Sequence, residues 1–596
     1  MVDVSSIIRA AWSLYNAGDL KGANSALQRA MKHAPRDAAV LQARAAFLFG
    51  ERKLVEAEYF ARQAAAVGGN HVACHHTLAS ILQAAGKLAE AEAAYGDALR
   101  CAPGHAEVLV GLAEVRKLRK NFRGAEDALR LALAAGGAGA RLARVSMFLA
   151  GLLRQTGRPE ESMAVLDSAV ARVPGHLELN VQSAVASNYV PMEPSERCAR
   201  LTRAGDLLAR AAGKPVRPPE NLRDPDRPLR IGYVSPDLRE HSVSYFIEPI
   251  LRSHDRANFH VTCYFGAPKA DAVTALLRSH VPAWRDVLDM KDDAFCELVR
   301  RDKIDILVDL AGHEPLNRLT AFASRLAPVQ VTYLGFASTT GLRAIDFRLV
   351  DAITDPPGSE EMAVENLVRL SPCFVCYAPR HRLAVNGPPS GLGGRVTFGS
   401  FNTLMKLCTP TIAAWSAVLS ASLGSRLLLK AAQFADASVR ARVRSEFAAC
   451  GVEGERVEFI EHSDSIEDHL LLYSRVDIAL DSLTYNGTTT TCEALWMGVP
   501  VVTMRGNAHA ARVGASLLSC VGLGELVAED QAGFVRIAAT LAADRDRLVA
   551  LRASMRARME RSELMNAGGF TARLESAYRA LWQVWCSKPG PPPVPR

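Results

Sequence analysis

The sequence predicts an α-helical repeat solenoid followed by two α/β domains, and three observations lead to this prediction. Small residues recur every 34 positions in the first third of the chain. Short apolar runs alternate with helical segments in the remainder, and a Gly/Pro-rich stretch at 387–394 interrupts that alternation. Repeats of this length are typical of stacked helical pairs, and alternating strands and helices favour parallel sheets with covered faces.

The composition is that of a multidomain globular protein. A chain of 596 residues is too long for one core, so two to four domains are expected. Hydrophobic residues make up 49% and charged residues 22%, which are ordinary values. The net charge of +7 comes without a dense Lys/Arg stripe, so nucleic acid is not an expected partner.

The cysteines and the apolar runs indicate a cytoplasmic protein. Twelve cysteines are scattered without framework spacing, which suits a reducing compartment. Cys373 and Cys376 form one CxxC with no second pair nearby, so we expect no bound metal. The start of the chain lacks a signal pattern, and no apolar run approaches the roughly 18–20 residues that span a bilayer.

The repeat frame rests on three alanine columns. Their members are Ala11, Ala45, Ala79 and Ala113; Ala23, Ala57, Ala91 and Ala125; and Ala30, Ala64, Ala98 and Ala132. A fifth copy follows a three-residue insertion and contains Ala150, Gly157, Ser162, Ala169 and Pro174. Small residues allow helices to approach closely. The frame resembles tetratricopeptide repeats (TPR), so residues 1–176 are expected to form five repeats and a protein-binding solenoid. An Ala-rich helix without repeats would not keep this step.

Three further regions complete the predicted organisation. Residues 177–228 form a helical connector that ends in a Pro-rich linker, and 229–386 form the first α/β domain. Residues 387–587 form the second α/β domain, closed by helices from about 531, and the tail 588–596 is expected to be disordered. A strand followed by a turn is predicted at 229–237. The other predicted strands are 260–265, 304–310, 329–334, 396–400, 427–430, 457–460, 477–480 and 499–504.

The stretch 477–504 carries the clearest functional signal. It reads as a strand, a polar loop with four consecutive threonines, a short helix and a second strand. Open α/β sheets bind ligands beyond the carboxyl ends of their strands, and the free amides of a helix start suit a phosphate. We therefore expect a pyrophosphate or nucleotide-sugar site at Thr489 and Thr490. The alternative is that the threonines only cap the helix.

Several collinear segments resemble the protein O-GlcNAc transferase family, glycosyltransferase family 41, in its bacterial and Spindly-like branch. They are 229–246, 309–313, 327–335, 398–406 and 477–504. The resemblance implies a GT-B fold, in which two Rossmann-like domains enclose a cleft and the second holds most of the nucleotide sugar. That fold requires no metal or other cofactor. Amides, hydroxyls and a cation then stabilise the charge on the leaving diphosphate.

The resemblance also assigns roles to single residues. Thr489 and Thr490 match the threonines that contact the diphosphate, and Lys406 matches the lysine there. His469 matches the histidine that contacts the base, and Glu493 matches the carboxylate that contacts the ribose. Read alone, Lys406 and His469 would be surface residues, and Glu493 would be a first-turn glutamate favoured by the helix dipole.

Two further histidines are expected in the cleft. His241 matches the histidine beside the acceptor hydroxyl, and a histidine has a pKa suited to a general base. A lone histidine in a turn is more often structural. His313 follows the end of a predicted strand and is expected to face the cleft.

One departure from the animal enzymes affects the donor. They have a histidine where this chain has Thr488, which we also include in the nucleotide-sugar site. Because the motif is closer to the bacterial and Spindly-like branch, the donor is either UDP-GlcNAc-like, or GDP-fucose or a CMP-nonulosonic acid. In the last two cases a flagellin acceptor and a role in flagellum assembly are the alternative.

The expected function is therefore a metal-independent protein O-glycosyltransferase. The repeats would hold an acceptor protein and present a Ser or Thr hydroxyl to the cleft. The competing hypothesis is a non-catalytic TPR adaptor or assembly factor whose GT-B half has lost activity. Nucleotide binding with sugar transfer separates the two.

Overall fold

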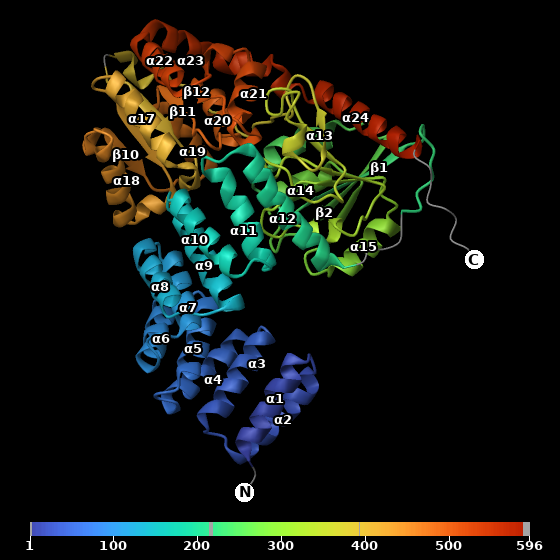
Figure 1. The fold of residues 1–596 in the computed structure, drawn as a ribbon, viewed down its shortest axis with the longest axis vertical. Helices are drawn as coiled ribbons and strands as arrows, with labels where there is room; N and C mark the ends of the chain where they lie inside the picture. The colour runs from blue at the N-terminus through green and yellow to red at the C-terminus, as the bar shows by residue number, and fades with distance from the viewer. Residues whose placement is uncertain (1–2, 214–218, 393, 588–596) are drawn as a thin grey trace. The chain divides into compact units, whose positions relative to one another are not determined.

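The computed structural model describes residues 3–213, 219–392 and 394–587 (Figure 1). Residues 214–218, near the start of the predicted Pro-rich linker, and the predicted disordered tail, from 588 on, lie outside the described residues. The chain divides into two compact units: residues 1–156 with 435–439, and residues 157–434 with 440–596. Each unit is described by itself.

The first unit is built of antiparallel helix pairs, drawn in blue in Figure 1. Its helices are α1 (Val4–Asn16), α2 (Leu20–His33), α3 (Ala38–Gly50), α4 (Leu54–Val67), α5 (Val72–Ala84), α6 (Leu88–Cys101), α7 (Ala106–Leu118), α8 (Phe122–Ala134) and α9 (Gly139–Gln155). All members of the three alanine columns are at most 3% exposed. Burial of a methyl group at every repeat is what close helix packing requires, so the predicted helical solenoid is confirmed.

The second unit begins with three helices that continue the helical part of the chain. They are α10 (Pro159–Arg172), α11 (Leu177–Ala186) and α12 (Pro194–Ala212). Helix α12 packs directly on the first sheet domain. A Cβ on Gly205 would lie 2.0 Å from the carbonyl oxygen of Gly341, and Gly341 itself has a φ of +71°. Only glycine fits this approach, so the connector is docked on the sheet domain that follows it.

The first sheet domain contains seven parallel strands in the order β3-β2-β1-β4-β5-β6-β7. The strands are β1 (Leu229–Ser235), β2 (Phe259–Phe265), β3 (Ala283–Asp286), β4 (Ile306–Asp309), β5 (Val329–Thr332), β6 (Phe347–Val350) and β7 (Asn366–Arg369). Strands β3, β6 and β7 are missing from the prediction. The first and last are half-exposed edge strands, and β6 contains Arg348, so none of them reads as an apolar run.

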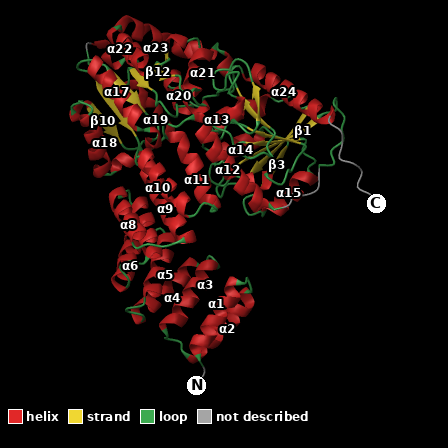
Figure 2. Ribbon diagram, in the orientation of Figure 1, coloured by secondary structure: helices red, strands yellow, loops and turns green. Residues whose placement is uncertain are grey.

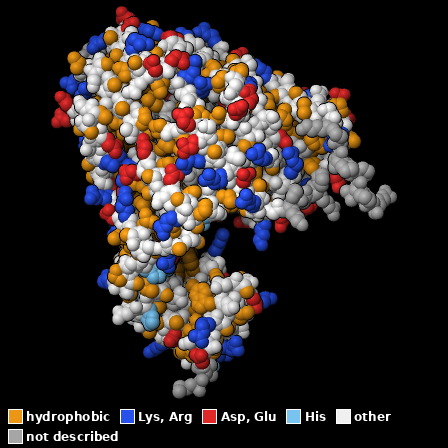
Figure 3. Space-filling view, in the orientation of Figure 1, with side chains coloured by type: hydrophobic (Ala, Val, Ile, Leu, Met, Phe, Trp, Pro, Cys, Tyr) orange, Lys and Arg blue, Asp and Glu red, His pale blue; other side chains and the backbone are white. Residues whose placement is uncertain are grey.

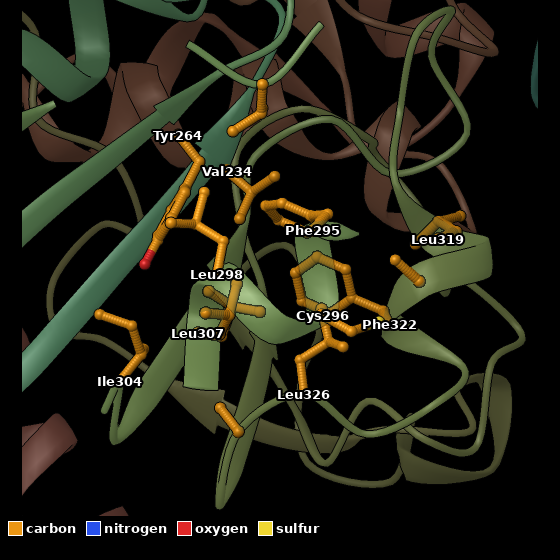
Figure 4. Close-up of a cluster of buried hydrophobic side chains, with 14 of the residues drawn as sticks. Val234, Tyr264, Phe295, Cys296, Leu298, Ile304, Leu307, Leu319, Phe322 and Leu326 are labelled. Carbon is orange, nitrogen blue, oxygen red and sulfur yellow. The ribbon is translucent and has the colours of Figure 1, made fainter. Parts of the chain in front are cut away.

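Aromatic and aliphatic side chains form the core on one face of this sheet (Figure 4). Tyr264 from β2 and Leu307 from β4 meet Phe295 of α15 (Asp292–Arg301) and Phe322 of α16 (Leu319–Phe322). The rings of Tyr264 and Phe295 pack edge to face, with their centroids 5.6 Å apart. This core packs helices α15 and α16 against the central strands, whose carboxyl ends carry the loops described below.

The second sheet domain contains six parallel strands in the order β10-β9-β8-β11-β12-β13. They are β8 (Thr397–Ser400), β9 (Arg426–Lys430), β10 (Val457–Ile460), β11 (Ile478–Leu480), β12 (Val501–Met504) and β13 (Val527–Ala528). The sequence pattern misses β13, which has only two residues. The yellow strands in Figure 2 lie between red helices in both sheet domains, which is the predicted pair of Rossmann-like layers.

The helices of the two sheet domains connect and cover these strands. They are α13 (Ser244–Ser253), α14 (Ala272–Ser279), α17 (Thr409–Ala421), α18 (Ala437–Ala449), α19 (Ile466–Leu471), α20 (Thr489–Trp496), α21 (Val513–Cys520), α22 (Gln531–Ala543), α23 (Arg545–Glu560) and α24 (Ala567–Ser587). The last of them leaves the second domain and packs on the first. Tyr578 Oη lies 3.3 Å from Tyr233 Oη, and Glu575 Oε1 lies 2.9 Å from His254 Nδ1. The end of the predicted second domain thus ties the two domains together.

Two further features are the charge on one face of the second unit and the hydrophobicity of the described helices. On the face of the second unit shown in Figure 3, basic and acidic side chains alternate. Among the described residues, no helix is long and apolar enough to cross a bilayer.

Candidate functional site

A cavity of about 280 Å³ lies where the two sheet domains face each other. The first domain contributes the turn that begins at His241, the end of β5 with residues 332–337, and Arg348 of β6. The second domain contributes the turn at 402–406, the loop after β11 and the segment at His509. Parallel sheets bind ligands at the carboxyl ends of their strands, and this cleft lies at those ends in both domains.

Asp481, at the end of β11, organises the loop in the second domain. Its carboxylate is buried and accepts hydrogen bonds from the amide of Gly487 at 2.7 Å and from the hydroxyl of Thr503 at 2.8 Å. Burial raises the pKa of Asp481 to about 6, against the opposing effects of these hydrogen bonds and of Lys406. The carboxylate thus pulls the loop into a fixed turn before α20 begins.

Gly487 allows the threonine run to fold back on this turn. A Cβ at this position would lie 2.4 Å from Thr490 Oγ1, so a larger residue would displace the threonine. Thr490 Oγ1 instead donates a 3.0 Å hydrogen bond to Asn402 Oδ1. Thr488, Thr489 and Thr490 all line the cleft at the first turn of α20. The first amides of a helix lack partners within it, so this end offers N–H donors and hydroxyls to an anion.

Lys406 supplies the cation beside that helix start. It lies in the short 3₁₀ turn Leu404–Lys406, and its Nζ donates a 2.7 Å hydrogen bond to the carbonyl oxygen of Asn486. The ammonium also lies 4.4 Å from the ring centroid of Tyr485. Burial lowers the pKa of Lys406 to about 8, although Asp481 opposes the shift. An ammonium that burial destabilises gains strongly from an incoming phosphate.

His241 lies across the cleft, in the turn before α13. Its Nδ1 accepts a 3.3 Å hydrogen bond from the amide of Val243 and lies 3.8 Å from Asp237 Oδ1. Burial lowers the pKa of His241 below its ordinary value, and Asp237 acts in the opposite direction. The imidazole is therefore neutral at neutral pH. Because Nδ1 accepts from Val243, its proton lies on Nε2, and the ring can act as a base only at Nδ1, once that 3.3 Å hydrogen bond is released.

His469 and Glu493 lie together outside the residues that line the cavity. His469 Nε2 is 3.1 Å from Glu493 Oε2, and His469 Nδ1 is 2.5 Å from the Nζ of Lys430. An ammonium only donates hydrogen bonds, so Nδ1 accepts and Nε2 donates to the glutamate. Glu493 follows Thr490 by three positions on α20, which places both on one side of the helix. The pair therefore flanks the threonine site.

His313 does not line the cavity. It is 6% exposed, and its Nε2 lies 2.7 Å from the carbonyl oxygen of Thr340. Burial lowers the pKa of His313 to about 4. The neighbouring residue Glu314 lines the cavity instead. Because β4 ends at Asp309 and the chain turns sharply at Gly312, which has a φ of +55°, His313 points into the domain. The expectation that it faces the cleft does not fit this geometry.

Sequence reasoning missed several side chains of the cleft: Asn402, Tyr485, Arg348 and His509. A charged residue within a strand was the available signal for Arg348, because it interrupts the apolar run 347–350. His509 begins a short 3₁₀ helix, His509–Ala511, that no sequence pattern marks. Among the described residues, no group of three or more His, Cys, Asp or Glu side chains is placed to hold a metal ion.

Comparisons with known proteins agree with this fold. The family model described as glycosyl transferase family 41 matches residues 201–383 and 391–574. A structure of a mutant Thermobaculum terrenum O-GlcNAc transferase superposes with a TM-score of 0.78 at 37% identity, and the match covers 86% of this chain and 98% of that one.

Curated plant proteins match about three fifths of the chain. The protein named probable UDP-N-acetylglucosamine–peptide N-acetylglucosaminyltransferase SPINDLY from Arabidopsis thaliana is 44% identical over 372 residues, which are 62% of this chain and 41% of that protein. The protein of the same class named SEC, also from Arabidopsis thaliana, is 31% identical over 370 residues, 60% of this chain and 38% of that protein. The chain therefore matches about two fifths of the length of these relatives.

The family model covers more than half of the chain, in both sheet domains, and the superposed transferase extends over most of the remainder. A TPR solenoid followed by a GT-B pair of Rossmann-like domains is the architecture that the sequence predicted. This chain belongs to glycosyltransferase family 41.

Proposed function

We propose that this chain is a protein O-glycosyltransferase that moves a sugar from a nucleotide sugar to a Ser or Thr hydroxyl of an acceptor protein. The observation that supports it most is the pairing of Lys406 with the first turn of α20 in one cleft, opposite His241. A cation and a helix start together bind a diphosphate, and a neutral imidazole accepts a proton.

The proposed reaction is a nucleophilic substitution at the anomeric carbon of the donor sugar. The acceptor oxygen forms a bond to that carbon while the bond from the carbon to the diphosphate oxygen breaks. The electron pair of the broken bond leaves with the diphosphate, and the proton of the hydroxyl passes to a base, for which His241 is our candidate. Lys406, with Thr488, Thr489 and Thr490, stabilises the charge on the leaving group.

We assign the nucleoside end of the donor to His469 and Glu493. Their mutual hydrogen bond and the contact with Lys430 hold both side chains in fixed rotamers beside α20. Phe401 packs against His469, with ring centroids 5.8 Å apart. A carboxylate and an imidazole suit the hydroxyls of a ribose and the edge of a base.

For the donor, we propose a UDP-GlcNAc-like nucleotide sugar first, because the curated relatives are named as UDP-N-acetylglucosamine-dependent enzymes. GDP-fucose and a CMP-nonulosonic acid are the competing donors, with flagellin as their acceptor and flagellum assembly as their role. The TPR solenoid is the proposed acceptor-binding part. The twelve cysteines are all free, which supports our proposal of a cytoplasmic location.

The test is a transfer assay on the full chain. Purified protein is incubated with each of the three donors and with proteins from cells that lack the gene, and intact masses are recorded. We expect acceptor proteins to gain one sugar residue with one donor only. Lys406→Ala should abolish the gain, and Lys269→Ala, at an exposed lysine, should not. No mass gain with any donor would favour the non-catalytic adaptor.

A further inference from the structure

Three buried side chains from both sheet domains form a group that the proposed mechanism does not yet use. Asp355, in the turn after β6, lies between Arg348 of β6 and His509 of the short helix His509–Ala511. Its Oδ1 is 3.3 Å from Arg348 Nη1, and its Oδ2 is 2.5 Å from His509 Nδ1. The side chains of Arg348, Asp355 and His509 are only 4%, 10% and 6% exposed. Arg348 and His509 line the cleft.

The charges in this group sum to zero. Burial alone would raise the pKa of Asp355, but Arg348 and His509 together lower it well below its usual range. Burial lowers the pKa of His509, and Arg348 adds to that effect, while Asp355 opposes it. A cationic guanidinium, a carboxylate and a neutral imidazole result. Since Asp355 accepts a hydrogen bond from Nδ1, the lone pair of His509 lies on Nε2.

Two polar atoms of the group are left without a partner. Among the residues that the structure describes, Arg348 Nη2 is buried and has no hydrogen bond. Within the same described part of the chain, the His509 ring makes one hydrogen bond, from Nδ1 to Asp355. His509 Nε2 therefore has no hydrogen-bond partner there. Phe374 packs edge-on against the imidazole at 5.0 Å and fixes its plane. A buried unpaired donor costs about 1–3 kcal/mol, which a ligand oxygen would recover.

Asn486 connects this group to the diphosphate site. Its carbonyl oxygen accepts from Lys406 Nζ at 2.7 Å, and its amide donates to the carbonyl oxygen of Ala510 at 2.8 Å. Ala510 directly follows His509. The imidazole therefore lies beside the position assigned to the diphosphate, where the sugar of a bound donor must lie.

The chemistry of the two free atoms selects the kind of ligand group. A phosphate only accepts hydrogen bonds, so it would leave the lone pair of His509 unpaired, and it would gain little from a group without net charge. A hydroxyl both donates and accepts. A carboxylate would gain little from a group without net charge. We propose that Arg348 and His509, positioned by Asp355, bind the hydroxyls of the donor sugar and select a neutral sugar. This inference rests on the proposed function and specifies its substrate.

The test separates sugar binding from diphosphate binding on the full chain by calorimetry. His509→Phe removes the acceptor and keeps the Arg348–Asp355 pair, and Arg348→Lys keeps the positive charge and removes the Nη2 donor. We expect both variants to bind the nucleotide sugar roughly ten- to a hundredfold more weakly, which is the loss typical of one hydrogen bond to a charged or buried group. The affinity for the matching nucleoside diphosphate should change less than about twofold. Asp355→Asn should show the same split, and Arg301→Met, at an exposed arginine, should change neither affinity.

Each outcome has one meaning. Retained nucleoside diphosphate binding shows that a variant is folded. Equal losses for the nucleotide sugar and the nucleoside diphosphate would overturn the inference, since the group would then contact phosphate or support the fold. Unchanged affinity for both would overturn it as well. If the unaltered chain binds no nucleotide sugar, the proposed function itself fails.

Discussion

The two sheet domains use the same structural device at the end of a central strand. Asp309 ends β4 and accepts from the amide of Gly312 at 2.9 Å and from the hydroxyl of Thr332, on the adjacent strand, at 2.9 Å. Asp481 follows β11 and makes the equivalent bonds to Gly487 and Thr503. Burial raises the pKa of each carboxyl to about 6. The turns after the two strands are therefore equally well fixed.

The domains differ in the segment that comes after each turn. After Asp309 the chain places His313 in the interior, next to the carbonyl oxygen of Thr340. After Asp481 it starts α20 at the cleft, with the threonine run and the ammonium of Lys406 beside it. The same turn thus leads into the domain interior in the first domain and into the proposed ligand site in the second. A lysine and a helix start beside the second turn make this distinction.

The loss of Lys406 should have the largest effect on this difference between the domains. We expect Lys406→Ala to lower the rate of sugar transfer by roughly a hundred- to a thousandfold, as removal of one group that stabilises a leaving oxyanion does. The measurement is the release of nucleoside diphosphate in the presence of acceptor protein. A variant that retains a tenth or more of the rate would show that the cation is not needed.

The next largest effect is expected on stability, from replacing the two equivalent aspartates at the strand ends. Asp309→Ala and Asp481→Ala each leave buried amides and a threonine hydroxyl unpaired, which should cost about 2–5 kcal/mol in the free energy of unfolding. Urea unfolding of the full chain measures this, and the corresponding Asn variants, which retain an acceptor oxygen, are the matched controls. Only Asp481→Ala should weaken nucleoside diphosphate binding. Equal weakening by both would remove the distinction between the domains.

The lowered pKa of Lys406 leads us to expect that nucleoside diphosphate affinity depends on pH. The pKa of Lys406 is about 8 in the empty cleft, so the ammonium that binds phosphate is present below that pH and is lost as the pH rises through it. We expect nucleoside diphosphate affinity to fall between about pH 8 and about pH 9.5, with uptake of about half a proton on binding near pH 8. Calorimetry in buffers of different ionisation enthalpy measures that uptake. An affinity that stays constant over this whole range would contradict the assignment.

The smallest effect on transfer concerns His313. We expect His313→Gln to change the transfer rate less than about twofold, because the side chain lies outside the cavity, and to reduce stability by about 1–2 kcal/mol through its lost hydrogen bond. The folded pKa of about 4 lies below the ordinary value of 6.5, so stability is retained above pH 6.5 and falls between pH 6.5 and pH 4. The Gln variant should lose that acid sensitivity. A large fall in transfer would return His313 to the site.

The parts of the fold that follow a period could be predicted from the sequence. The alanine columns repeat at a fixed step, which predicts the solenoid helices. Strands β1, β2 and β4 are apolar runs, which predicts buried strands. Strand β6 was missed because Arg348 lies within it, and its charge is stabilised by Asp355, seven positions later, whose carboxylate also pairs with a histidine of the other domain. Only the folded chain brings these three together.

The site residues also differ in how far the sequence could predict their positions. Lys406, Thr489 and Thr490 could be predicted as neighbours because they belong to long collinear motifs, and in the structure all three line one cleft. His313 was expected there because it follows a strand, but the positive φ of Gly312 turns it inward. Position after a strand is readable from sequence, whereas the direction of one side chain depends on the backbone of the turn.

The most direct test of the central claim is calorimetric titration of the full chain and of Lys406→Ala with UDP, GDP and CMP. We predict that one of the three binds the unaltered chain and that its binding is lost in the variant. Binding of none of them, or equal binding to both proteins, would contradict a nucleotide-sugar site at the start of α20.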